Sequence, residues 1–424
     1  MTRGLNGTAL GCVAALIAFS MLPGFAGAGQ ATPVAATSTP AWTQFGVDGL
    51  VARTFSNGDC PAIEIDGQSA PMTLRAASNR DFPRAVCEAA IPADSAAASI
   101  GGQELALMPS SLARIAIVGD TGCRIWQDRI QDCNNPASWP LVEISRQIAA
   151  WQPDLIIHVG DYVYRESACP DGDTRCAGTP FGDTGATWDV DFFDPMASSL
   201  GAAPWIFLRG NHETCDREGM GWFRTLDPWP MPDACQIFTE PFRLPIPGMT
   251  MLVMDTAMIG DTKSTPELDA EYARQFDVLA SLTTQGAWLL THRPIAGGIL
   301  RLSDREQYVS YATVRNAVNN ELPDGIEVVL SGHIHLAEAL MFGADQSLQA
   351  QIIAGHGGTA MDDGETAAFS GELLGNPHLD AGLVGASFGW MTLETEADRL
   401  TATALAVDGG ILFRVHLPKP TMAK

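Results

Sequence analysis

The sequence predicts an α/β protein in which sheets and helices form layers, preceded by a small all-β domain. From residue 112 onward, apolar runs rich in β-branched residues alternate with segments of helical periodicity, as in layered α/β folds. Residues 44–108 hold only short strand-like runs separated by Gly, Pro, Asn and Asp. The 424 residues are 46 % hydrophobic and 17 % charged, which supplies a large core and excludes wholesale disorder. We therefore expect one large and one small domain.

Residues 1–28 are predicted to be an export signal. Arg3 gives a positive start, an apolar stretch follows over about 9–25, and residues 26–28 read Ala-Gly-Ala, a pattern that signal peptidase accepts. The alternative is an uncleaved membrane anchor, which the short length of the run and its cleavage-like end disfavour. Residues 29–43, rich in Ala, Thr and Pro, are expected to form a linker. We therefore expect the mature protein in the periplasm or outside the cell.

The cysteines agree with export. Cys12 lies inside the predicted signal and would leave with it. The remaining eight, an even number in an exported chain, indicate disulfide bonds, although sequence alone does not fix their connectivity. A zinc site is the competing interpretation, and the absence of any C-x-x-C pair disfavours it. Spacing groups the eight into local couples, which we predict to be Cys60–Cys87, Cys123–Cys133, Cys169–Cys176 and Cys215–Cys235.

Short strands are expected in the β domain, and buried strands alternating with helices in the larger domain over 109–420. In the β domain, strand-like runs lie at 50–55, 62–66, 72–77, 85–91 and 104–108. In the larger domain, strands are predicted at 115–120, 155–161, 205–211, 251–255, 286–292, 326–333 and 349–358, and helices at 141–151, 266–282 and 305–320. Two or three antiparallel strands with a turn at 408–410 are predicted over 387–417. Apolar runs without alternation are typical of strands buried on both faces.

Polar side chains follow these strands at the points where the strands end. The end residues are Asp120, Asp161, Asn211, His292 and His333. Ligand sites of open α/β sheets lie in the crevice at such strand ends. With Tyr164 and His335 these side chains supply more donors than one metal in an open site can use, but enough for two metals. Asp161 is the natural bridge, because a carboxylate has two oxygens. His158 lies inside its strand, and we interpret it as structural.

Five short blocks give these residues a family resemblance. The blocks are GDTG (119–122), GDYVY (160–164), GNHE (210–213), THRP (291–294) and GHIH (332–335). Together they resemble the blocks of the calcineurin-like metallophosphoesterases, and within these the purple acid phosphatase branch. That branch has Gly where most relatives place a metal-binding His, here Gly122, and a compensating Tyr, here Tyr164. The resemblance covers about residues 112–360 and implies a four-layer α/β/β/α core preceded by a small β domain.

The resemblance also implies a role for each residue. Asp120, Tyr164 and His335 would bind one metal, Asn211, His292 and His333 the other, and Asp161 would bridge them. A phenolate is a hard anionic donor, so Tyr164 favours Fe(III), and the second metal would be Fe(II), Zn(II) or Mn(II). His212 would donate a hydrogen bond to the phosphate and a proton to the leaving oxygen. Glu213 would orient His212.

Two departures from the branch bear on specificity. After His292 the chain has no further histidine, and after His335 it reads Leu-Ala-Glu-Ala without the usual Tyr and Arg. Arg293 could contact substrate, although an ion pair within the protein is the more ordinary role for it. Substrate preference and pH optimum therefore stay open, whereas the metal donors are all present.

The resulting expectation is an exported binuclear phosphatase that hydrolyses phosphomonoesters by attack of a metal-bound hydroxide. A phosphodiesterase using the same metals is the alternative, and a non-catalytic secreted binding module is the alternative from another class. The expected partner is a small phosphate ester. Nucleic acid is not expected, because 25 Lys and Arg stand against 49 Asp and Glu. Membrane attachment is not expected after signal cleavage, and the oligomeric state stays open.

Overall fold

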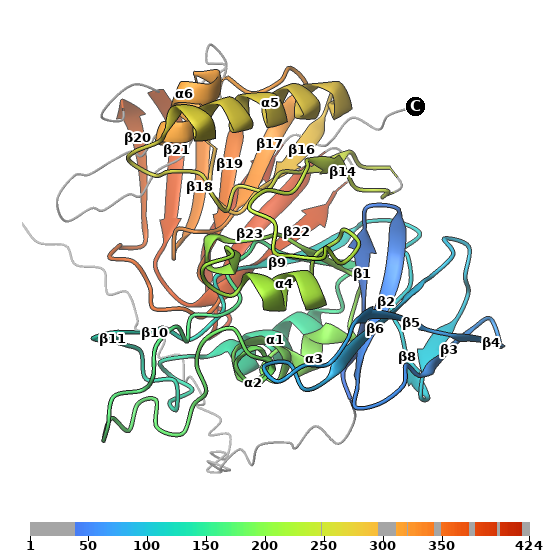
Figure 1. The fold of residues 1–424 in the computed structure, drawn as a ribbon. Helices are drawn as coiled ribbons and strands as arrows, with labels where there is room; N and C mark the ends of the chain where they lie inside the picture. The colour runs from blue at the N-terminus through green and yellow to red at the C-terminus, as the bar shows by residue number, and fades with distance from the viewer. Residues whose placement is uncertain are drawn as a thin grey trace, which may run out of the picture. The chain divides into compact units, whose positions relative to one another are not determined.

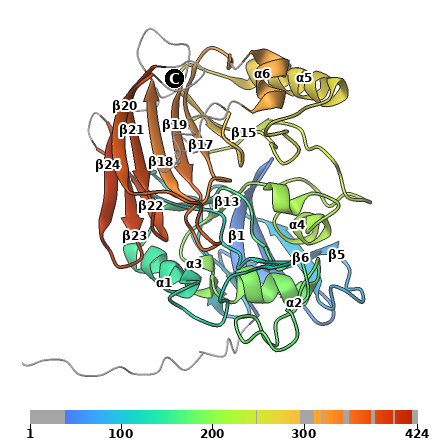
Figure 2. The same ribbon diagram turned by 90° about the vertical axis from the view of Figure 1, so that its left-hand side faces the viewer.

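Two β-sheets packed face to face, with helices on their outer faces, make up the architecture (Figures 1 and 2). The computed structural model describes residues 39–246, 248–295, 311–319, 321–342, 349–372, 378–396 and 399–417. The predicted export signal therefore lies outside the described residues, as do most of the predicted linker and residues 305–310 of a predicted helix.

Among the described residues, the larger sheet has ten strands. They are β1 (Ala41–Gly46), β2 (Gly49–Ser56), β5 (Thr73–Ala76), β6 (Ala85–Ala90), β9 (Arg114–Val118), β12 (Leu155–His158), β13 (Trp205–Phe207), β22 (Gly389–Thr395), β23 (Leu400–Ala406) and β24 (Ile411–Leu417). Their order is β24-β23-β22-β9-β12-β13-β1-β2-β6-β5. The central strands β9, β12 and β13 are parallel, so their carboxyl ends lie at one edge of the sheet.

The second sheet has eight strands in the part of the chain that the structure describes. They are β14 (Phe242–Arg243), β15 (Met251–Val253), β16 (Ala287–Leu290), β17 (Ile326–Ser331), β18 (Ala337–Phe342), β19 (Ala350–Ala354), β20 (Ala367–Glu372) and β21 (His378–Gly385). Their order is β14-β15-β16-β17-β19-β18-β21-β20. Strands β15, β16, β17 and β19 are parallel, whereas β14, β18, β20 and β21 pair antiparallel.

Helices cover the outer face of each sheet. They are α1 (Leu141–Trp151), α2 (Gly185–Trp188), α3 (Ala197–Leu200), α4 (Gly219–Thr225), α5 (Pro266–Leu282) and α6 (Ala312–Val318), with a π-helical turn at Asp189–Phe193 and a 3₁₀ turn at Asn211–Glu213. Helices α1 to α4 lie against the larger sheet, and α5 and α6 against the second sheet (Figure 2). In α5, Thr265 caps the start by accepting a hydrogen bond from Leu268 N, and Pro266 occupies the first turn.

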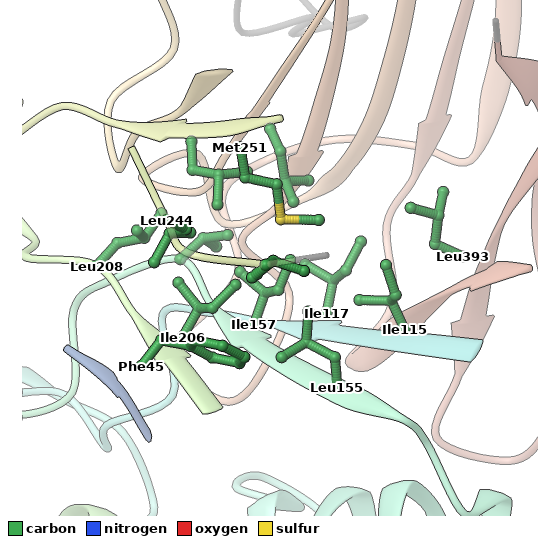
Figure 3. Close-up of a cluster of buried hydrophobic side chains, with 14 of the residues drawn as sticks. Phe45, Ile115, Ile117, Leu155, Ile157, Ile206, Leu208, Leu244, Met251 and Leu393 are labelled. Atoms are coloured by element: carbon green, nitrogen blue, oxygen red, sulfur yellow. The ribbon is translucent and has the colours of Figure 1, made fainter. Parts of the chain in front are cut away.

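The main core lies between the two sheets (Figure 3). Ile115 and Ile117 of β9 point into this core, whereas Ala116 and Val118 belong to the cluster beneath α1 to α4. Successive side chains of a strand point to opposite faces, so a strand buried on both faces must be apolar throughout. This arrangement explains the unbroken apolar runs and confirms the four-layer α/β/β/α core.

The N-terminal β region is all strand, and it contributes to two sheets. Strands β1, β2, β6 and β5 continue the larger sheet beyond β13. A separate four-stranded sheet contains β3 (Ala62–Ile65), β4 (Gln68–Pro71), β7 (Ala98–Ile100) and β8 (Gln103–Glu104). Of the run predicted at 104–108, only Glu104 lies in a strand, at the end of β8. Leu105 and its neighbours pack on the core as irregular chain. The domain boundary at 109–111 stays a prediction.

All four predicted disulfides are present: Cys60–Cys87, Cys123–Cys133, Cys169–Cys176 and Cys215–Cys235. The second pair closes a loop that holds the short hairpin of β10 (Ile125–Trp126) and β11 (Arg129–Ile130). Three of the pairs begin within a few residues of a predicted metal ligand, so they restrain the loops on which those ligands lie.

Candidate metal centre

Strand ends from both sheets meet at the candidate metal centre. Asp120, Asp161 and Asn211 follow β9, β12 and β13 of the larger sheet. His292 and His333 follow β16 and β17 of the second sheet. His292 Nε2 lies 3.2 Å from Asp161 Oδ2, and His335 Nε2 lies 3.5 Å from Asp120 Oδ1. The site is therefore built across the junction of the two sheets.

Two groups of potential metal ligands share Asp161. Asp161, His292 and His333 form one group, and Asp120, Asp161 and His335 form the other. Within each group the ligand atoms lie within 4.8 Å of one another. Such spacing suits a cation held between them, and a shared carboxylate can bind two cations through its two oxygens.

The phenol of Tyr164 lies in the second group. Its oxygen is 2.8 Å from Asp161 Oδ2, 3.1 Å from Asp120 Oδ1 and 3.0 Å from His335 Nε2. Burial and the charges of Asp161 and Asp120 raise the pKa of Tyr164 well above 10. The phenol is therefore protonated until a cation displaces its proton, and metal binding at this atom would release that proton.

Two histidines have their tautomers set by the main chain. His292 Nδ1 donates to Val159 O at 2.7 Å, and its Nε2 faces Asn211 Oδ1 at 3.0 Å. His335 Nδ1 donates to Ala360 O at 3.1 Å, and its Nε2 faces Tyr164 and Asp120. A metal-binding histidine typically uses one nitrogen in this way to orient the other.

The charge state of the site also suits a metal. Burial lowers the pKa of His333 to about 4 and that of His335 to about 3, so both rings are neutral, as a ligand must be. Burial and the nearby Asp161 raise the pKa of Asp120 well above its usual range. Burial also acts to raise the pKa of Asp161, but His292 and His212 outweigh it and hold that pKa well below its usual range. Two buried acids therefore lie side by side, and a bound cation would neutralise them. The donor set fits two metal ions.

The backbone at three of these residues is left-handed. The φ angles are 55° at Asp120, 60° at Asp161 and 71° at His333. This conformation costs roughly 1–2 kcal/mol for most residues other than glycine. Gly122 lies beside them in a space that admits no side chain, because a Cβ there would lie 2.7 Å from Tyr162 O and 2.8 Å from Tyr164 N. The local chain is thus held in unfavourable conformations at the site, which is typical of functional sites.

The structure corrects the predicted role of Glu213. Its carboxylate accepts hydrogen bonds from the main-chain N–H groups of Gly210 (2.9 Å), Asp161 (3.1 Å) and Tyr162 (2.8 Å). Burial, followed by the charge of Asp161, raises the pKa of Glu213 to about 8. Because its oxygens are directed at the backbone beneath the site, Glu213 ties together the loops after β12 and β13 and does not orient the His212 ring.

The acid that contacts His212 is Glu166, which the sequence analysis missed. His212 Nδ1 lies 2.5 Å from Glu166 Oε1, and the ring packs on Tyr164 with centroids 3.7 Å apart. Arg217 forms an ion pair with Glu166, and its Nη2 lies 2.7 Å from His212 Nδ1. Glu166 also groups with His212 and Glu218 as potential metal ligands. No motif or periodicity relates Glu166 to His212, so no sequence signal marked the contact.

Arg293 and His158, both considered in the sequence analysis, and the neighbouring Tyr162 have structural contacts. Arg293 forms an ion pair with Asp261 at 2.9 Å. His158 is buried, lies 3.0 Å from Thr121 Oγ1 and stacks on Tyr162. The hydroxyl of Tyr162 donates to Leu208 O at 2.9 Å. These contacts agree with the structural interpretation of His158 and with an ion pair at Arg293.

Two stacked sheets bring carboxylate, phenol, amide and imidazole donors together at their strand ends. This arrangement is the architecture of a two-metal phosphoesterase. The chain belongs to the calcineurin-like phosphoesterase family, whose sequence model matches residues 113–337. No curated protein sequence matches the chain.

Solved structures share this fold at low sequence identity. A purple acid phosphatase, PPD1 from yellow lupin (Lupinus luteus) seeds, is 13 % identical with a TM-score of 0.59, over 90 % of this chain and 74 % of that one. PhoD is 12 % identical with a TM-score of 0.54, over 91 % of each chain. These likenesses show the fold. In the part of the chain that the structure describes, no helix is long and apolar enough to cross a membrane.

Proposed function

We propose that this protein is an exported, binuclear metal-dependent phosphatase that hydrolyses phosphomonoesters. The observation that carries the proposal is the pair of ligand groups sharing Asp161, with His212 beside them and outside both. His212 N donates to Asp161 Oδ1 at 2.9 Å, which places this residue against the shared carboxylate. A histidine that is close to two metals but is not needed to hold them is free to act on a substrate.

Each metal would be held by residues of known position. Asp120, Tyr164 and His335 would hold one cation, Asn211, His292 and His333 the other, and Asp161 both. The hard phenolate of Tyr164 favours Fe(III) at the first position, with Fe(II), Zn(II) or Mn(II) at the second. When bound there, two such cations would supply positive charge for the phosphoryl oxygens and for an attacking water.

His212 would supply the proton that the leaving oxygen needs. Its ring lies between Tyr164 and the carboxylate of Glu166. An acid at Nδ1 favours the ring form that carries a proton on Nδ1 and stabilises the charge when Nε2 is also protonated. Burial lowers the pKa of His212, and Asp161 and Glu166 counteract that effect. The same ring can therefore take up and release a proton during turnover.

The test compares an aryl phosphate monoester with the matching diester, using purified protein whose iron, zinc and manganese have been counted. Asn211→Ala is the control, because it removes one predicted ligand. Turnover of the monoester by protein containing two metals, abolished in Asn211→Ala, is the expected result. Turnover of the diester alone would move the function to a phosphodiesterase. Two bound metals without turnover of either ester would favour a binding module, and failure to bind metal after reconstitution would refute the proposal.

Export has a separate test. N-terminal sequencing of the protein recovered from the periplasm or medium is expected to start after Ala28. Recovery of the intact N-terminus in the cytoplasmic fraction would refute export and leave the enzymatic proposal untouched.

A further inference from the structure

An arginine without an acidic partner lies beside the candidate metal centre. Arg124 Nη2 is 3.2 Å from His335 Nδ1, and its guanidinium carbon is 5.3 Å from the centroid of the Tyr164 ring. Among the residues that the structure describes, no carboxylate forms an ion pair with Arg124. By contrast, Arg217 pairs with Glu166 and Arg293 with Asp261. Arg124 is therefore a cation at the site whose guanidinium is not paired directly with a described carboxylate.

His335 does not satisfy the guanidinium of Arg124. The Nδ1 atom of His335 donates to Ala360 O, and its Nε2 faces Tyr164 and Asp120 on the predicted ligand side. A neutral imidazole has one donor and one acceptor nitrogen, so both are in use. The guanidinium has five N–H donors and no strong acceptor among these neighbours. Because Arg124 is only half-buried, an anion entering from solvent can reach these donors.

The main chain of Arg124 is held firmly. Its N–H donates to Gln131 Oε1 at 3.0 Å, and its carbonyl accepts from Gln131 N at 2.9 Å. Gln131 Nε2 in turn donates to Gly358 O at 2.8 Å. The preceding residue, Cys123, is bonded to Cys133 and donates its N–H to Asp191. The backbone that carries Arg124 therefore needs no reordering when a ligand binds, which favours binding.

We propose that Arg124 binds the phosphoryl group of the substrate and selects esters with a dianionic terminal phosphate. This inference rests on the proposed phosphatase function and adds the charge state of its substrate. The planar guanidinium fork matches two oxygens of a phosphate group. A monoester near neutral pH carries close to one more negative charge than a diester. A diester also has one fewer free oxygen, so it gains less from the same guanidinium.

The experiment replaces Arg124 by Gln and by Lys in the full chain loaded with metal. Arg129→Gln is the matched control, because Arg129 lies exposed in the same hairpin and stacks on Trp126. Three quantities are measured: metal content, the affinity for inorganic phosphate by calorimetry, and kcat/KM for an aryl monoester and the matching diester.

We expect Arg124→Gln to weaken phosphate binding and to lower monoester kcat/KM by about 10- to 100-fold, as for loss of a charge-assisted hydrogen bond. Diester kcat/KM is expected to fall by no more than about threefold, metal content to stay constant, and Arg124→Lys to retain part of the activity. Arg129→Gln is expected to match the wild type.

An equal loss on both esters, an unchanged affinity for phosphate, or a loss of metal in Arg124→Gln would overturn the proposal. Failure of the phosphatase function itself is distinguishable, because it appears as absence of monoester turnover in the wild type. The calorimetric comparison of phosphate binding needs no turnover and tests Arg124 in either case.

Discussion

Gly210 approaches Asp161 so closely that the metal centre depends on the absence of a side chain there. A Cβ on Gly210 would lie 2.1 Å from Asp161 Oδ1 and 2.3 Å from Asp161 N. Neither atom can move aside easily, because Asp161 is buried and its backbone is in a left-handed conformation. Sequence patterns placed Gly210 before a ligand, but only the packed loops show what it touches.

We expect Gly210→Ala to destabilise the protein by about 1–3 kcal/mol, the usual cost of overpacking, and to lower its metal content. Denaturant unfolding and metal analysis of the purified variant check both effects. Gly58→Ala is the matched control, since a Cβ at Gly58 would meet nothing within 4 Å. Full metal content in Gly210→Ala would contradict the close approach.

Glu166→Gln tests the acid that contacts His212. Gln keeps the shape of Glu and one hydrogen-bond acceptor but removes the charge that stabilises a protonated ring. We expect kcat to fall by roughly 10- to 100-fold, part of the 10²–10⁴-fold contribution of a general acid, with metal content unchanged. The exposed Glu143→Gln in α1 serves as the control. An unchanged kcat in Glu166→Gln would show that this contact does not support turnover.

At the scale of elements, one half-buried acid connects α4 to the loop before α2. The carboxylate of Asp183 accepts hydrogen bonds from Met220 N (2.8 Å), Gly221 N (3.0 Å) and Trp188 Nε1 (3.1 Å). Burial raises the pKa of Asp183 to about 6, although these donors oppose that shift. No periodicity in the sequence relates Asp183 to α4, so this link appears only when the chain is folded.

The raised pKa of Asp183 predicts a pH effect on stability. In the unfolded chain an Asp titrates near 4, so between about pH 4 and 6 the folded state binds more protons. The stability that Asp183 contributes is therefore full below about pH 4 and is lost as the pH rises through 6. Asp183→Asn removes this dependence. We expect the free energy of unfolding of the wild type, relative to that of Asp183→Asn, to be about 1–2 kcal/mol higher at pH 5 than at pH 7.5. Guanidinium unfolding of both proteins at the two pH values measures this difference. A flat or reversed difference would contradict the raised pKa.

At the scale of the whole molecule, the metal centre joins the two sheets. Its predicted ligands come from loops after β9, β12 and β13 on one side and after β16 and β17 on the other. Bound cations would thus cross-link the sheets and offset two adjacent buried carboxylates, Asp120 and Asp161. They would also reduce a net charge of −24, which by itself disfavours compactness.

Removal of metal with a chelator is therefore expected to lower Tm by about 5 °C. Ligand binding at about 1,000 times Kd stabilises the folded state by about 4 kcal/mol, and because the entropy of unfolding grows by about 2.1 cal/mol/K per residue, each kcal/mol moves Tm by little more than about 1 °C in a chain of this size. Differential scanning calorimetry before and after chelation measures the change, and returning the metals is expected to restore Tm. An unchanged Tm in protein shown to have lost two metals would contradict the cross-link.

Local patterns in the chain were enough to predict much of this molecule. Strands buried on both faces show as unbroken apolar runs, and donors at strand ends mark the edge where parallel strands meet. The seven core strands predicted from these runs are present, and residues such as Asp120, Asp161 and His292 come together as their positions predict. The disulfide couples followed from short spacing in the chain.

Contacts between distant segments had no such signal. The pairing of β1 with β13 joins the N-terminal strands to the larger sheet, and it depends on which strand edges remain open after folding. The contact of Glu166 with His212 and the position of Arg124 beside His335 likewise depend on how separate loops pack. Apolar periodicity and strand ends depend on residues that are neighbours in the sequence. The partner of a polar side chain on a loop depends instead on the three-dimensional path of the chain.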